Sequence, residues 1–199
     1  MTTKIVSWWL LILFIANGWW CCNSCWKEER TALLQLKANI NYKIAGDYLP
    51  SWVANETSDC CRWEGIVCSN KTRRVTELSI IVEKINQEEQ FSTLTGTNTD
   101  DSILENWLFN ASLFIPFKNL KALLLPELSL ADWVKNEGFE KLRRLRKLET
   151  LDLSGNKFNR SIFESISQLS SLKSLNLSGN YINGSGSNTW FSLFASLNY

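Results

Sequence analysis

Six cysteines are the residues of this chain whose type and spacing most directly suggest chemistry. They form two groups of three: Cys21, Cys22 and Cys25, then Cys60, Cys61 and Cys68. Thiolates at such spacings bind zinc in reducing compartments and form disulfides in oxidising ones. The choice between a metal site and disulfides therefore depends on the compartment, and the sequence leaves the state of Cys21 and Cys22 open.

The first residues of the chain predict entry into the secretory pathway. Lys4 precedes the apolar stretch IVSWWLLILFIANGWW, which ends near the small residues Ala16 and Gly18. This order is typical of a signal peptide, here residues 1–18 or 1–24. A retained membrane anchor is the alternative, because the apolar run is nearly long enough to span a bilayer. Secretion favours disulfides, so we expect no metal ligands.

Acid–base and nucleophilic chemistry have no identifiable carrier in the sequence. The chain has no histidine, the side chain that most often serves as general acid or base. It contains no P-loop, HExxH or GxSxG sequence, and the paired Asp100 and Asp101 lie in a polar stretch without partners. We therefore expect no catalytic residues, no cofactor and no enzyme activity.

The charge balance gives no reason to expect a nucleic acid as partner. Lys and Arg number 21 against 20 Asp and Glu, a net charge of +1. The run KLRRLRK at residues 141–147 is basic, but Leu142, Leu145 and Leu148 keep a three-residue spacing that fits one segment of a repeat. We interpret the run as a solvated face anchored by leucines.

Two stretches near the end of the chain repeat one another. They indicate which structural elements position the side chains of the chain. LETLDLSGNKFN at residues 148–159 returns as LKSLNLSGNYIN at residues 172–183, at a constant offset of 24. This period falls within the leucine-rich repeat range of about 20 to 29 residues. A duplicated helical segment is the alternative, but identity at seven of twelve positions argues against it.

Alternation inside each copy predicts a short strand. A polar residue stands between two leucines, as Asp152 does between Leu151 and Leu153. Side chains alternate faces along a strand, so the leucines face the core and the polar residues face outward. One such coil cannot bury its own apolar face, so its neighbours must cover it. The sequence therefore predicts an α/β leucine-rich repeat solenoid with a short, curved parallel sheet.

An asparagine follows each predicted strand, Asn156 in the first copy and Asn180 in the second. Their side chains are expected to bond backbone groups of the turn and to stack as an asparagine ladder. An upstream coil at residues 117–125 fits the same leucine spacing at an offset of 28, but Leu128 stands where the ladder asparagine would be. This coil is predicted to be irregular.

The outward strand positions form the candidate ligand-contact surface. They follow from alternation alone, without any binding signature. The predicted contact residues are Ala122, Leu124, Thr150, Asp152, Ser154, Ser174, Asn176 and Ser178.

N-x-S/T sequons add a second candidate chemistry, glycan attachment. The acceptor residues are Asn55, Asn70, Asn110, Asn159, Asn176 and Asn183. In a secreted chain they predict several N-glycans. Asn176 differs from the others, because a glycan there would obstruct the outward face of the strands.

The segment before the repeats reads as a cap that begins with an amphipathic helix. Its expected apolar positions are Leu33, Leu34, Leu36 and Ile40. Its expected solvent-facing positions are Glu28, Glu29, Arg30 and Lys37. Further along, Trp52 and Trp63 are interpreted as core packing beside cysteines and not as ligand contacts.

The order of motifs in this segment resembles the N-terminal capping domain of plant extracellular leucine-rich repeat proteins. A cysteine, an ALLxLK helix, an SW pair at residues 51–52 and CCxWxGxxC follow one another. The family pairs the first cysteine with the first of the adjacent pair. The resemblance thus implies disulfides joining Cys25 to Cys60 and Cys61 to Cys68, which would help close the apolar edge of the first coil.

FNASLFIPFKNLKALLL at residues 109–125 resembles the early repeats of plant receptor-like proteins. The expected organisation is a cap at 25–70 and repeats at 71–199, irregular at 81–116, regular at 145–184 and incomplete at the C-terminus.

The resemblance implies a non-catalytic recognition module for a peptide, carbohydrate or protein ligand, at the outer face of the plasma membrane or in the extracellular space. It also implies defence or developmental signalling through a kinase-bearing co-receptor. Two alternatives stay open: a secreted inhibitor of cell-wall-degrading enzymes, resembling polygalacturonase inhibitors, and an inert shortened product.

Overall fold

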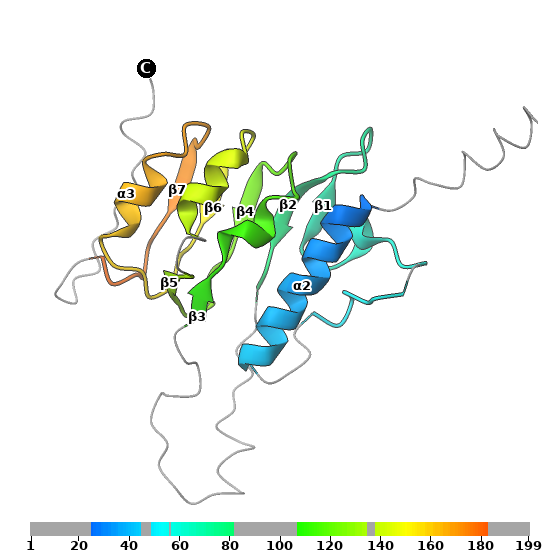
Figure 1. The fold of residues 1–199 in the computed structure, drawn as a ribbon, viewed down its shortest axis with the longest axis horizontal. Helices are drawn as coiled ribbons and strands as arrows, with labels where there is room; N and C mark the ends of the chain where they lie inside the picture. The colour runs from blue at the N-terminus through cyan, green and yellow to red at the C-terminus, as the bar shows by residue number, and fades with distance from the viewer. Residues whose placement is uncertain (1–24, 45–48, 56, 82–106, 135–137, 183–199) are drawn as a thin grey trace, which may run out of the picture.

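A computed structural model describes residues 25–44, 49–55, 57–81, 107–134 and 138–182 (Figure 1). The elements, with 3-10 helices labelled η, are α2 (Lys27–Ile44), η1 (Cys60–Arg62), β1 (Ile66–Cys68), β2 (Val75–Ser79), β3 (Trp107–Phe109), η2 (Ala111–Phe114), β4 (Ala122–Leu124), β5 (Leu130–Trp133), η3 (Phe139–Arg144), β6 (Thr150–Asp152), α3 (Ile162–Ile166) and β7 (Ser174–Asn176). The expected signal peptide, residues 82–106 of the irregular stretch and the end of the chain from residue 183 lie outside these residues. None of the described helices has the length and apolar content needed to cross a membrane.

Five strands form the main sheet in the order β1-β2-β4-β6-β7. β1 pairs antiparallel with β2, and every later pair is parallel. Ala122 lies opposite Thr150, and Thr150 lies opposite Ser174, so the pairing reproduces the sequence offsets of 28 and 24. The helical segments lie on one side of this sheet (Figure 1). The predicted leucine-rich repeat solenoid with a helical cap is confirmed.

The core is a column of leucines contributed by successive coils. Leu123 and Leu151 lie opposite one another in adjacent strands and are fully buried. Leu120 and Leu148 occupy equivalent buried positions just before these strands. Burial of one such side chain contributes about 1.5 to 3 kcal/mol. Because each leucine packs against the coils beside it, this stabilisation exists only when the coils are stacked.

Asn156 ties three stretches of backbone together. Its Oδ1 accepts hydrogen bonds from the N–H groups of Leu128 (3.1 Å) and Leu130 (3.0 Å). Its Nδ2 donates to the carbonyls of Leu125 (2.8 Å) and Leu153 (2.9 Å). The preceding coil lacks a ladder asparagine of its own, so the side chain of its neighbour bonds the backbone of its turn.

Asn180 repeats this arrangement one coil later. Its Oδ1 accepts from the N–H of Phe158 (3.0 Å), and its Nδ2 donates to the carbonyls of Leu153 (2.8 Å) and Leu177 (3.0 Å). Each asparagine thus bonds backbone groups of its own coil and of the coil before it. Two such residues in register form the ladder that keeps the turns at a fixed spacing.

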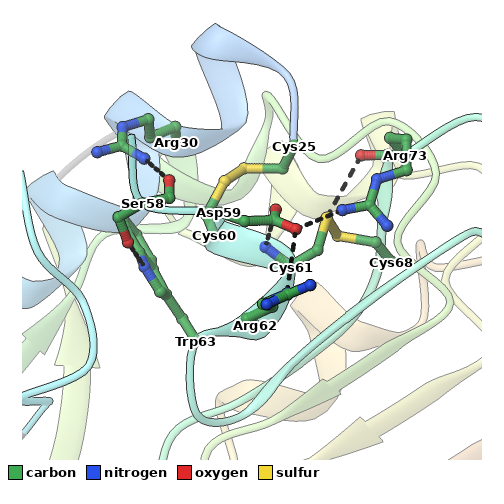
Figure 2. Close-up of polar contacts among 10 residues, drawn as sticks. All are labelled: Cys25, Arg30, Ser58, Asp59, Cys60, Cys61, Arg62, Trp63, Cys68 and Arg73. Atoms are coloured by element: carbon green, nitrogen blue, oxygen red, sulfur yellow. Dashed lines mark hydrogen bonds and ion pairs between the residues drawn. A yellow bond between two sulfur atoms is a disulfide. The ribbon is translucent and has the colours of Figure 1, made fainter. Parts of the chain in front are cut away.

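Two disulfides hold the cap, and their pairing is the one that the family resemblance implies (Figure 2). Cys25 is joined to Cys60 and Cys61 to Cys68, with Cα atoms 5.6 and 5.5 Å apart. The first bridge fastens the start of α2 to η1, and the second fastens η1 to β1. The adjacent cysteines of η1 therefore connect the cap helix to the first strand of the sheet.

Asp59 organises the polar side of the same junction (Figure 2). One carboxylate oxygen accepts from the backbone N–H of Cys61 (3.0 Å) and caps η1. The other lies 2.6 Å from the Arg73 guanidinium and 3.9 Å from that of Arg62. Arg73 precedes β2, so this contact links the cysteine pair to the second strand.

The two cap tryptophans pack as expected. Trp52 and Trp63 are buried and stacked, with ring centroids 5.8 Å apart and planes inclined by 20°. Trp52 donates from its indole nitrogen to the Glu64 carbonyl (2.9 Å), and Trp63 donates to the Ser58 hydroxyl (2.7 Å). The Arg30 guanidinium lies 5.1 Å from the Trp63 centroid. The indole N–H groups of both tryptophans are thus hydrogen-bonded inside the cap.

The solvent-facing position predicted for Glu29 is wrong. Its side chain is 0% exposed and accepts a hydrogen bond from the N–H of Val75 (3.1 Å), at the start of β2. Arg74 provides an ion pair at 3.4 Å. Burial raises the pKa of this carboxyl above its ordinary value, although the Val75 bond and the Arg74 charge act in the opposite direction. Glu29 joins the cap helix to the sheet.

Replacement of Glu29 tests this junction. Glu29→Ala leaves the Val75 N–H buried without an acceptor, and we expect the free energy of unfolding to fall by about 2 to 3 kcal/mol in urea titrations at pH 7. Glu29→Gln keeps an acceptor and should lose less. A loss below about 0.5 kcal/mol for the alanine variant would contradict the assigned role.

The pH dependence of stability, compared between the wild type and Glu29→Gln, checks the direction of the Glu29 pKa shift. The pKa of Glu29 lies above 4.5 in the folded state, so between the unfolded and folded pKa values the unfolded chain ionises first and is stabilised. The stability of the wild type relative to Glu29→Gln should therefore fall as pH rises from about 4.5 through the folded pKa. A relative stability that rises over this window would contradict the account.

Substitution of Asn156 tests whether its side-chain hydrogen bonds stabilise the turns. Asn156→Ala strands two buried N–H groups and two carbonyls, so we expect it to destabilise the chain by about 3 kcal/mol or more. Asn156→Asp retains the acceptor for Leu128 and Leu130 but turns a buried carboxylate oxygen toward two carbonyls, so at pH 7 it should destabilise the chain at least as much as alanine. Thermal and urea unfolding of the three chains provide the measurement, and equal stabilities would refute the ladder.

Candidate ligand-binding face

Two rows of side chains cross the outward face of the parallel sheet. Strand pairing aligns Ala122, Thr150 and Ser174 in one row. The second row contains Leu124, Asp152 and Asn176. These six predicted contact residues are half-buried or exposed and alternate with core leucines. We call the two rows, with Ser154 and Ser178 just beyond them, the strand face.

Hydrogen bonds within and between coils preorganise the polar end of the strand face. Asn176 donates from Nδ2 to the Asp152 carboxylate at 3.0 Å. The other Asp152 oxygen accepts from the N–H (2.8 Å) and hydroxyl (2.6 Å) of Ser154. Asn176 holds Ser178 in the same way, at 3.1 and 2.8 Å. Four predicted contact residues thus form two copies of one turn, joined side chain to side chain.

The strand face extends further toward the cap than the predicted contact residues. Glu77 lies opposite Ala122 and Ser79 lies opposite Leu124, so β2 adds one residue to each row. Val67 lies opposite Glu77 on β1 and is half exposed. A register shift between β1 and β2 interrupts simple alternation there. Glu77 directly precedes the core residue Leu78, so alternation along the strand could have predicted its outward position.

The chemistry of the strand face is that of hydrogen bonding and apolar contact. It presents hydroxyls, one amide, the carboxylates of Glu77 and Asp152, and the apolar side chains of Val67 and Leu124. Within the described residues, no group of three or more His, Cys, Asp or Glu side chains could hold a metal ion. An extended polar ligand lying across the strands would meet groups suited to binding it.

The sequon asparagines occupy different environments. Asn55, Asn70 and Asn159 are exposed, whereas Asn110 is half-buried and its side chain caps η2 by accepting from the Ser112 N–H (3.0 Å). Asn176 lies on the strand face and uses the nitrogen that would carry a glycan to contact Asp152. Asn183 lies outside the described residues. Glycosylation at the six positions stays a prediction.

Comparison with protein families agrees with this architecture. Residues 27–69 match the family described as Leucine rich repeat N-terminal domain. Residues 147–169 and 171–193 each match the family described as Leucine Rich Repeat. The two matches cover the disulfide-bonded cap and the two regular coils.

Known sequences and structures point to the same family. Cuscuta receptor 1 of Solanum lycopersicum is 41% identical over 149 residues, covering 73% of this chain and 11% of that protein. Receptor-like protein 15 of Arabidopsis thaliana is 37% identical over 158 residues, covering 78% and 14%. The chain thus spans less than a sixth of the length of these relatives.

Among solved structures, a plant ice-binding protein has a TM-score of 0.50 at 22% identity, covering 79% of this chain and 42% of that one. This similarity concerns the fold alone. The cap, the repeats and the level of identity to receptor-like proteins lead to one conclusion: the chain belongs to the plant leucine-rich repeat receptor-like proteins.

Proposed function

We propose that this chain is a non-catalytic, extracellular ligand-recognition module that contacts its ligand with the strand face. The ligand is a peptide, a carbohydrate or a protein. In the whole protein, recognition takes place at the outer face of the plasma membrane and is passed to a co-receptor kinase in defence or developmental signalling. The names of the relatives support a receptor role.

The observation that carries this proposal is the unbroken register of the strand face. Four neighbouring strands, from β2 to β7, place outward side chains in two straight rows. Neighbouring strands lie about 4.8 Å apart, so each row offers a contact group at every such step. The asparagine ladder fixes these positions before a ligand arrives, which lowers the entropic cost of binding.

The cap supports an extracellular setting on physical grounds. Its two disulfides join α2, η1 and β1, and such bonds persist in oxidising compartments. Together they stabilise the end of the sheet that would otherwise expose the apolar edge of the first coil. The disulfide-bonded cap is therefore suited to the oxidising conditions outside the cell.

Paired substitutions on the strand face test the proposal. Thr150→Arg with Ser174→Arg places two bulky cations in one row, and we expect at least about a tenfold loss of affinity for a strand-face ligand. The matched control is Ser167→Arg with Ser170→Arg, at exposed positions on the helical side of the same coils. The control should unfold within about 0.5 kcal/mol of the wild type. The strand-face variant should lose about 1 kcal/mol, because its two arginines lie opposite one another on neighbouring strands.

The binding measurement uses a panel of secreted plant peptides and cell-wall oligosaccharides, assayed by biolayer interferometry. A ligand whose affinity drops only in the strand-face variant supports the proposal. Equal affinity for both variants would contradict the proposed face. Inhibition of a fungal polygalacturonase by the wild-type chain would instead favour the inhibitor alternative.

A further inference from the structure

The run of basic residues at η3 forms a charged surface that the strand face does not use. Five of the seven residues from 141 to 147 are basic and none is acidic, in a chain whose net charge is only +1. With Lys118 of the preceding coil, we call this surface the basic ridge. Its members are Lys118, Lys141, Arg143, Arg144, Arg146 and Lys147.

Packing fixes the backbone of the basic ridge and turns its charges outward. Leu142, Leu145 and Leu148 are buried in the core and anchor the segment. The residues between them, including Arg143 and Arg146, are exposed. The ridge lies along η3 and the connection from η3 to β6, seen in yellow in Figure 1. It therefore occupies a different surface from the strand rows.

The neighbouring coil contributes to the same ridge. Lys147 donates a hydrogen bond from Nζ to Asn119 Oδ1 at 2.7 Å, which places residues 28 apart side by side. The same offset gives Lys118 and Arg146 equivalent positions in the two coils, and both are exposed. The cations are thus arranged across two coils and not only along the chain.

The charges of the basic ridge are not neutralised by other described residues. None of its six members makes an ion pair within the described part of the chain. Two acidic residues flank the run, and neither forms an ion pair with the ridge cations within the described part of the chain. Glu140 accepts from the Gly138 N–H (3.2 Å), and Glu149 pairs with Lys173 (3.1 Å). The ridge consequently carries a local positive potential.

The geometry of the ridge points to a class of ligand. A row of exposed cations suits a polymer with a repeated negative charge better than a single small anion. Three of the cations are arginines, whose planar guanidinium groups bond carboxylates in a bidentate manner. No sequon occurs between Asn110 and Asn159, so the predicted glycans are attached outside this run.

We propose that the basic ridge binds an acidic polysaccharide whose carboxylates recur along the chain, a polymer of uronic acids. The choice of a polysaccharide over a nucleic acid rests on the extracellular setting of the proposed function. Contact along the ridge holds the module against an acidic matrix while the strand face stays free for its own ligand.

The test compares two triple variants with the same change in charge. Arg143→Gln, Arg144→Gln and Arg146→Gln remove half of the ridge. Lys27→Gln, Arg62→Gln and Lys71→Gln remove three exposed cations in and next to the cap. Thermal unfolding of both variants should match the wild type, because all six side chains are exposed.

Binding is measured with de-esterified polygalacturonate at low and moderate salt, and with the same polymer fully methyl-esterified. We expect the ridge variant to lose at least about tenfold in affinity and the cap variant less than about twofold, with weaker binding as salt rises. The esterified polymer, which has the same backbone without charge, should not bind.

Three results would overturn the proposal. Equal losses in the two variants would show that binding follows net charge and not the ridge. Retention on the esterified polymer would show that carboxylates are not recognised. Tighter binding to vesicles containing phosphatidylserine, or to duplex DNA, than to polygalacturonate would assign the ridge to another class of partner. None of these results bears on the strand face, whose test uses different variants.

Discussion

The structure depends on one constraint: a single coil of this chain cannot bury its own apolar face. Leu123 and Leu151 are fully buried only because the coils stack, and the stack must end somewhere without exposing its core. At the N-terminal end this is the task of the cap. The disulfides, the stacked tryptophans and Glu29 all act at that boundary.

Fixing the first coil to the cap also determines where the outward side chains of the later strands lie. Once the first coil is fixed to the cap, parallel pairing and the asparagine ladder place each later strand in register with the one before it. Outward side chains of neighbouring coils then contact one another, as Asp152 and Asn176 do. The strand face is thus a product of stacking, and the same stacking sets the basic ridge on a separate surface.

Regular features were predictable from the sequence, because period and alternation depend on local physics. The 24-residue repeat predicts the strand positions, the leucine core and the ladder role of Asn156. Glu29 was misplaced because its acceptor role involves Val75, which is 46 positions away. The pairing of β3 with β5 and the irregular β1–β2 register also depend on long-range contacts. Cysteine connectivity came from the family resemblance, since sequence alone does not determine it.

The central claim is that the cap supports the stacked coils, both the coil of β4 that α2 contacts and the coils beyond it. Native-state hydrogen exchange on the wild type and on Trp52→Ala tests it, through the N–H groups of Leu125 and Leu153, which donate to the next strand at 2.8 and 2.9 Å. The account predicts that both amides lose protection in the variant together with Val75 at the cap junction. If Val75 exchanges freely while Leu125 and Leu153 keep wild-type protection, the coils are stable without the cap and the claim is wrong.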